Sequence, residues 1–136
     1  MAAMRCLTAL LALLIAAPAA AQERAPAERQ TLGELAYAIG ETHALRQLCM
    51  GPTDQYWRDR MLRLTQVEDA DPAFEAEMRE RFNTGYAAGQ GAAVECGPAS
   101  HRAEAAAAAR GQALAAKLST IMRKIDPPVA GDEPVQ

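Results

Sequence analysis

The chain has 136 residues and is 50% hydrophobic but only 4% aromatic, which suits one small domain. Lys and Arg number 14 against 17 Asp and Glu, so the formal net charge is −3 and no excess of basic residues indicates a phosphate-binding surface. This length excludes a doubly wound dinucleotide-binding enzyme and a barrel enzyme, and the charge disfavours nucleic acid as a partner.

The first 21 residues have the pattern of a secretory signal peptide. Arg5 precedes an apolar run from Leu7 to Ala17, and a small-residue stretch ends at Ala21. A retained membrane anchor is the alternative, but the run is too short for a bilayer core of about 30 Å. We therefore expect cleavage after Ala21, export to the periplasm and no stable membrane insertion afterwards. Loss of Arg5 leaves 13 basic and 17 acidic residues, a net charge of −4.

Two cysteines, Cys49 and Cys96, remain when Cys6 is removed with that segment. An even pair in an exported chain predicts a disulfide, which the chain-entropy model values at about 4 kcal/mol for a loop of this length. The sequence has no CxxC pair and shows no Cys/His cluster. We therefore expect no metal site, no cofactor and no thioredoxin-like exchange.

Residues 22–30 read as a flexible lead-in to the first of four predicted helices, and residues 31–125 as the helical domain. The first helix is predicted to begin with Thr31 as N-cap and Glu34 as its capping-box partner. Its apolar stripe includes Leu32, Leu35, Ala36, Ile39 and His43, and Gly51-Pro52 ends it. Leu45 and Leu48 project from another side, so the helix either packs on two faces or leaves these residues as an apolar strip for a partner.

The second helix is predicted to begin at Thr53 or Asp54, with Trp57, Met61 and Leu64 on one line. The third has a stronger start signal, because Asp71 can cap it and Pro72 suits its first position. Its stripe begins with large residues and continues through Gly85, Tyr86, Gly89 and Ala93 to Cys96.

A fourth helix follows Gly97-Pro98 and carries the alanine run of residues 105–109. Its slim surface is predicted to pack on the glycine side of the third helix, and residues 126–136 are predicted to be a disordered tail. The fold class is therefore all-α, a small four-helix bundle-like domain with up-down topology and one disulfide. In that topology the first and third helices end at the same pole, each near a cysteine.

Four separated segments occur in a recognisable order: HALRQLC at residues 43–49, Trp57-Arg58 with Met61, FNTGY at residues 82–86, and Cys96. They resemble a family of small exported alphaproteobacterial proteins, a domain of unknown function, over residues 31–122. In the family pattern a glycine directly follows the first cysteine, whereas here Met50 precedes Gly51. The resemblance implies a secreted all-helical domain without an established activity, and it supplies no catalytic residue.

Several residues at these motif positions are larger or more polar than a bundle core requires. They form either a recognition surface near the disulfide, since arginine and tryptophan are typical hot-spot residues, or an internal polar network that fixes helix register. The set consists of His43, Arg46, Trp57, Arg58, Asn83 and Tyr86.

The sequence contains no catalytic constellation, so we do not expect an enzyme. The leading hypothesis is an exported interaction or accessory protein that binds another envelope protein or a wall component, with Leu45 and Leu48 as contacts. The alternative is a small-ligand carrier that binds between helices near Trp57 and Tyr86. A remote alternative is a hydrolytic enzyme with His43 as base. The sequence does not define the oligomeric state.

Overall fold

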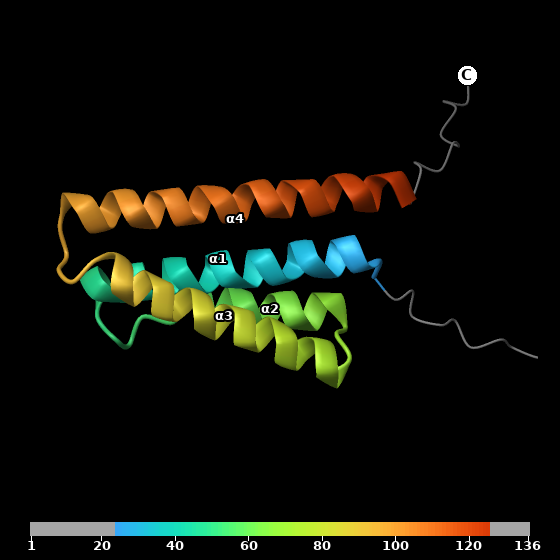
Figure 1. Ribbon diagram of the computed structural model, residues 1–136, viewed down its shortest axis with the longest axis horizontal. Coiled ribbons are helices and arrows are strands. Elements are labelled where there is room, and N and C mark those ends of the chain that lie inside the picture. The colour runs from blue at the N-terminus through green and yellow to red at the C-terminus, as the bar shows by residue number, and fades with distance from the viewer. Residues whose placement is uncertain (1–23, 126–136) are drawn as a thin grey trace, which may run out of the picture.

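The computed structural model describes residues 24–125, which fold into four helices without a strand (Figure 1). These are α1 (Pro26–Met50), α2 (Tyr56–Glu68), α3 (Pro72–Ala92) and α4 (Pro98–Ile125). They run alternately up and down, so the predicted all-α, bundle-like class and its topology are confirmed. The expected signal peptide (1–21) and tail (126–136) lie outside the described residues.

The central element is α1, which contacts each of the other three helices. Figure 1 shows α4 on one side of α1 and the pair α2 and α3 on the other. The main core cluster accordingly takes residues from all four helices, including Leu32, Ile39, Met61, Met78 and Leu118. A helix in this position must bury several faces, which explains why apolar residues on α1 extend beyond a single stripe.

The first helix begins six residues earlier than the capping-box pattern predicts, since its N-cap is Ala25 and not Thr31. Pro26 occupies its first turn and Ala25 its N-cap position, so residues 26–30 are helical rather than a lead-in. Thr31 lies inside the helix, where its hydroxyl donates to the carbonyl of Ala27 at 2.9 Å. Proline is well suited to a helix start because its missing N–H needs no partner there, and this signal outweighed the Thr31-Glu34 pair.

The starts of the next two helices differ in how well they were predicted. Helix α2 begins at Tyr56, later than expected, and the Asp54 carboxylate accepts from the Tyr56 N–H at 3.3 Å. Helix α3 begins as predicted, because the Asp71 carboxylate accepts from the N–H groups of Ala73 and Phe74 at 3.0 and 2.9 Å. These bonds satisfy two of the free donors at the helix N-terminus.

The small residues of α3 pack against α1, and the predicted pairing with α4 is wrong. A methyl group at Gly85 would collide with the carbonyl of Tyr37, and one at Gly89 would meet that of Glu41. Gly40 of α1 is equally close to the Phe82 carbonyl. Glycines on both helices therefore bring the two backbones into direct contact, which a side chain at these positions would prevent.

Helix α4 uses its small residues on another face of α1. Ala107 is fully buried, and a methyl group at Gly111 would lie in ordinary contact with Ala38 and Leu35. An ion pair between Arg110 and Glu41 also connects the two helices. Much of the remaining surface of α4 is exposed, because α4 lies on the far side of α1 from α2 and α3 (Figure 1).

The predicted disulfide is confirmed. Cys49 near the end of α1 is bonded to Cys96 in the loop after α3, with their Cα atoms 5.0 Å apart. Helices α1 and α3 both end at this pole of the molecule (Figure 1). No helix within residues 24–125 has the length and apolar content needed to cross a membrane.

Candidate functional site

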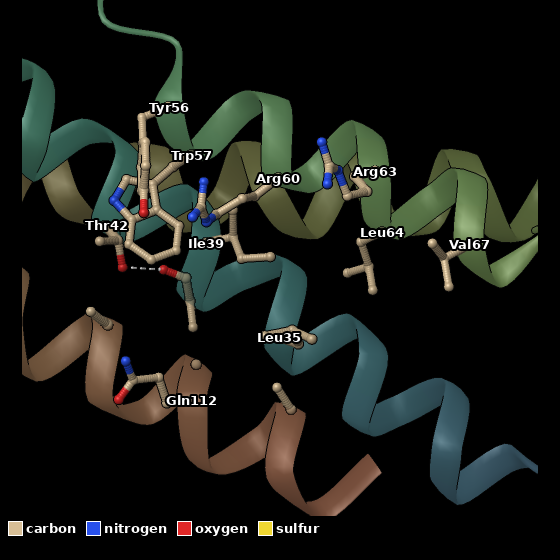
Figure 2. Close-up of a pocket in the computed structure, with 14 residues that line it drawn as sticks. Leu35, Ile39, Thr42, Tyr56, Trp57, Arg60, Arg63, Leu64, Val67 and Gln112 are labelled. Atoms are coloured by element: carbon tan, nitrogen blue, oxygen red, sulfur yellow. Dashed lines mark hydrogen bonds between the residues drawn. The ribbon is translucent and has the colours of Figure 1, made fainter. Parts of the chain in front are cut away.

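A groove of about 470 Å³ runs along α1 between α2 and α4. Its floor comes from α1, and its α4 wall consists mainly of small residues that keep that wall low. Figure 2 shows the larger side chains of α2 on the opposite wall, directed over Ile39 and Leu35. The lining residues are Leu35, Ala38, Ile39, Thr42, Tyr56, Trp57, Arg60, Arg63, Leu64, Val67, Ala108, Gly111, Gln112 and Ala115.

Aromatic rings and a guanidinium form one end of this groove. The rings of Tyr56 and Trp57 meet edge to face with their centroids 5.2 Å apart. The Arg60 guanidinium lies 3.7 Å from the centre of the Tyr56 ring and 5.5 Å from that of Trp57. Cation–π contacts of this kind hold the guanidinium over the groove while its donors stay available.

The charge of the groove has one sign. Arg60 and Arg63 are its only ionisable lining residues besides Tyr56, and no carboxylate lines it. Within residues 24–125 neither arginine has an ion-pair partner. Both side chains are exposed, as is Val67 at the far end, which has 74% of its surface in solvent. The site therefore combines an apolar floor with unpaired positive charge on one rim.

Trp57 is half-buried in this wall, and its indole N–H has no hydrogen-bond partner within the described structure. A buried donor without a partner is costly, so such groups are rare in folded proteins. The sequence prediction placed Trp57 with Tyr86 in one ligand site, but Tyr86 does not line this groove. The carrier hypothesis in that form lacks its second residue.

His43 belongs to the interior and not to the groove. It is 4% exposed, and its ring lies 5.8 Å from Phe82 and 5.5 Å from Tyr86 between ring centroids. Its Nδ1 atom has no hydrogen-bond partner in the described structure. Burial lowers the pKa of His43, so the imidazole is neutral at physiological pH.

Gln47 organises the α1–α2 loop, although it was not among the residues predicted for a site. Its amide nitrogen donates to the carbonyls of Pro52 and Asp54 at 3.0 and 2.9 Å. Its amide oxygen accepts from the Tyr86 hydroxyl at 2.7 Å. A single side chain thus connects the loop to α3. The glutamine lies inside the HALRQLC segment, so that motif was the signal available for it.

Arg46 fixes the same loop from its other side. Its guanidinium is 3.0 Å from the Asp54 carboxylate and 4.8 Å from the centre of the Tyr56 ring. The Arg46 hydrogen bond is the main cause of a lowered pKa at Asp54. Arg46 therefore supports the aromatic end of the groove without lining it.

Arg58 and Asn83 are both exposed and line a separate cleft of about 220 Å³ between α2 and α3. The six motif residues are consequently divided among the interior, the loop, the groove and this cleft. They do not assemble into one surface, and only Trp57 belongs to the groove.

The predicted apolar strip is also incorrect for its first member. Leu45 is 1% exposed, so it belongs to the interior and is not available to a partner, whereas Leu48 is half-buried. A central helix buries residues on several sides, and the second apolar line of α1 results from that position.

Three potential metal ligands meet at the disulfide pole, although none was expected from the sequence. Cys49, Cys96 and His101 have their ligand atoms within 4.8 Å of one another. His101 follows Cys96 by five residues, a spacing that could have indicated the cluster, but Cys49 is distant in sequence.

Fold and site together define an all-α, disulfide-linked domain with an open apolar groove. The chain belongs to the family described as "Protein of unknown function (DUF2385)", whose model matches residues 26–121. Comparisons with curated proteins and with solved structures gave no match.

Proposed function

We propose that this protein is exported and acts in the cell envelope by binding an acidic amphipathic helix of a partner protein in the α2–α4 groove. The observation that carries the proposal is the groove itself. Arg60 lies over two aromatic rings at one end, and the unpaired Arg60 and Arg63 border an apolar floor. Aromatic and arginine side chains are the residue types that contribute most to binding at protein interfaces.

The shape of the groove favours a helical segment. Its α2 wall extends from Tyr56 to Val67, which is twelve residues or about 16 Å of helix. Among the described residues, the groove is open to solvent on the side opposite its floor. A helix of about three turns can lay an apolar stripe along such a floor with anchors at positions i, i+3, i+4 and i+7.

The charge of the groove favours carboxylates on that helix. Arg60 and Arg63 are one turn apart on α2, so their guanidinium groups line one edge of the floor. Acidic residues flanking the apolar stripe of a partner would pair with them. A second copy of the chain is a less suitable occupant, because the groove contains no carboxylate for the arginines of that copy to bind.

Export is supported by the signal-like pattern of residues 1–21 and by the Cys49–Cys96 disulfide. Disulfides persist in oxidising compartments such as the periplasm. We expect the chain recovered from the periplasmic fraction to begin at Gln22, which mass spectrometry of the intact protein can establish. An N-terminus that retains residues 1–21 in that fraction would contradict cleavage at this site.

The binding proposal can be tested with a designed peptide of about four turns that carries a leucine stripe flanked by glutamates. Fluorescence anisotropy of the labelled peptide should give a saturable isotherm with the mature oxidised protein. The double variant Arg60→Glu/Arg63→Glu should weaken binding by about tenfold or more, because two attractions become repulsions.

The matched control is Arg58→Glu, which changes an exposed arginine on the same helix outside the groove. It should leave the affinity within about twofold. A peptide in which glutamines replace the glutamates should bind more weakly than the acidic peptide, because it loses the attraction to Arg60 and Arg63. If Arg58→Glu weakened peptide binding as much as Arg60→Glu/Arg63→Glu does, the groove would be contradicted as the binding site. Binding of small apolar acids with no peptide binding would instead favour the carrier hypothesis.

A further inference from the structure

The disulfide pole contains a cluster whose chemistry does not depend on the groove. The Nε2 atom of His101 lies 3.9 Å from the sulfur of Cys49 and 3.9 Å from the sulfur of Cys96. Cys96 and His101 are both exposed, and Cys49 is half-buried. An imidazole is therefore positioned equally close to both sulfurs at a place that solvent can reach.

The start of α4 holds His101 in this position. Pro98 begins the helix, and the Ser100 hydroxyl accepts from the Gly97 N–H at 2.9 Å in a capping arrangement. The backbone N–H of His101 donates to the backbone carbonyl of Gly97 at 3.0 Å, and this bond closes the first turn of α4. Ser100 is 1% exposed and its oxygen is 3.7 Å from the Cys49 sulfur, so this turn is packed against the disulfide.

We propose that reduction of the disulfide converts Cys49, Cys96 and His101 into a binding site for Zn²⁺. Zinc takes thiolate and imidazole ligands in a tetrahedral arrangement, with metal–ligand distances of about 2.3 Å to sulfur and 2.0 Å to nitrogen. Ligand atoms in such a site are about 3.5–3.8 Å apart. The two sulfur–nitrogen separations already approach that value, so the main change is the separation of the two sulfurs.

The reaction is balanced by a dithiol reductant. One thiolate of the reductant attacks a sulfur of the disulfide and forms a mixed disulfide, and the second thiolate releases it as a cyclic disulfide. Two electrons and two protons thereby pass to Cys49 and Cys96. Zinc binding then expels the two thiol protons and leaves one coordination position for water.

Metal binding to the reduced, desalted protein under nitrogen tests the proposal. Titration with Co²⁺ as a zinc substitute should produce a thiolate-to-metal charge-transfer band that saturates at one equivalent. Competition with a chromophoric chelator should then give the zinc affinity. The oxidised protein should show neither signal, because a disulfide does not supply thiolate ligands.

His101→Ala should lower the zinc affinity by roughly tenfold or more, because it removes one of three protein ligands. The matched control, Arg102→Ala, changes the next residue of the same exposed turn and should bind zinc like the wild type. Equal affinity of the wild type and His101→Ala would overturn the three-ligand site, as would a reduced wild type without the charge-transfer band.

Thermal unfolding followed by circular dichroism covers the case in which reduction loosens the fold. One equivalent of Zn²⁺ should raise the melting temperature of the reduced wild type, and the rise should be smaller in His101→Ala. A reduced chain whose melting temperature is unaffected by zinc would overturn the proposal. Peptide binding by the oxidised protein is independent of this result, so the two proposals can fail separately.

Discussion

His43 illustrates at the scale of one residue how burial decides a role. A histidine in the apolar stripe of α1 was compatible with a base, a recognition residue or a member of a polar network. The structure places its ring between Phe82 and Tyr86 with 4% exposure. Burial is the largest cause of its lowered pKa. The charge of Asp54 opposes this shift, and that of Arg58 acts in the same direction as burial.

This burial predicts a pH-dependent stability. The unfolded chain binds a proton at His43 below the ordinary pKa of 6.5, whereas the folded chain resists it. The contribution is therefore fully present above that pH and is lost as the pH falls toward the folded value. Urea unfolding of His43→Gln should show a shallower fall in stability than the wild type between about pH 7 and pH 5. An unchanged slope in His43→Gln would contradict the prediction.

Gln47 and Tyr86 form a second residue-scale feature, in which one hydrogen bond of 2.7 Å joins the α1–α2 loop to α3. Tyr86→Phe removes the hydroxyl and leaves the ring against His43. We expect a loss of about 0.5–1.5 kcal/mol in the free energy of unfolding, measured with urea. A Thr84→Val variant serves as control, because the Thr84 hydroxyl bonds only within its own exposed helix turn. Equal losses of unfolding free energy in the two variants would contradict a stabilising role for the hydrogen bond between Tyr86 and Gln47.

At the scale of the elements, the contact between α1 and α3 depends on glycine. Gly40 and Gly85 each face a carbonyl of the opposite helix with no room for a methyl group. The glycine spacing of α3 was visible in the sequence and correctly indicated close packing. It could not identify the partner, because α1 and α4 both offer small residues. Gly40 within the long α1 stripe was the overlooked signal.

Gly85→Ala should lower the free energy of unfolding by about 1–3 kcal/mol, because the new methyl group forces the two backbones apart. Gly91→Ala in the same helix has open space around its methyl group and should be neutral or slightly stabilising. Urea unfolding with both variants measures the difference. If Gly85→Ala proved as stable as Gly91→Ala, the close approach of α1 and α3 would be contradicted.

Helix boundaries were predictable only where one start signal dominated. Asp71-Pro72 marks α3 correctly, because both residues favour the same start. Thr31 with Glu34 matched a capping box equally well by sequence, yet Pro26 starts the helix and Thr31 bonds back to Ala27. Several residues near a helix N-terminus can satisfy the local requirements of a helix start. The position that is used depends on how the first turns pack.

At the scale of the whole molecule, α1 separates α4 from the α2–α3 pair and so creates grooves on either side of α4. The sequence indicated four helices, their directions and the disulfide. It could not indicate the groove, which depends on the distance between α2 and α4 across α1. Trp57 was identified as a candidate from its residue type, whereas Arg60 and Arg63 resembled ordinary surface charges.

The disulfide acts on the whole molecule because it joins residues 47 apart in sequence. A Cys49→Ala/Cys96→Ala variant should lose about 4 kcal/mol of unfolding free energy by the chain-entropy model. Chemical unfolding in urea measures this difference, and the slope should be steeper for the variant because its unfolded chain is less compact. A loss below about 1 kcal/mol would contradict the idea that the disulfide stabilises the fold by restricting the unfolded chain.

The emission of Trp57, the single tryptophan of the chain, tests the groove most directly. Titration of the oxidised protein with an unlabelled acidic amphipathic peptide should shift the emission to shorter wavelength and saturate, since a bound helix would cover the exposed part of the indole. The Arg60→Glu/Arg63→Glu variant should require a much higher peptide concentration for the same shift. Peptide binding by anisotropy with unchanged Trp57 emission would contradict a binding site in this groove.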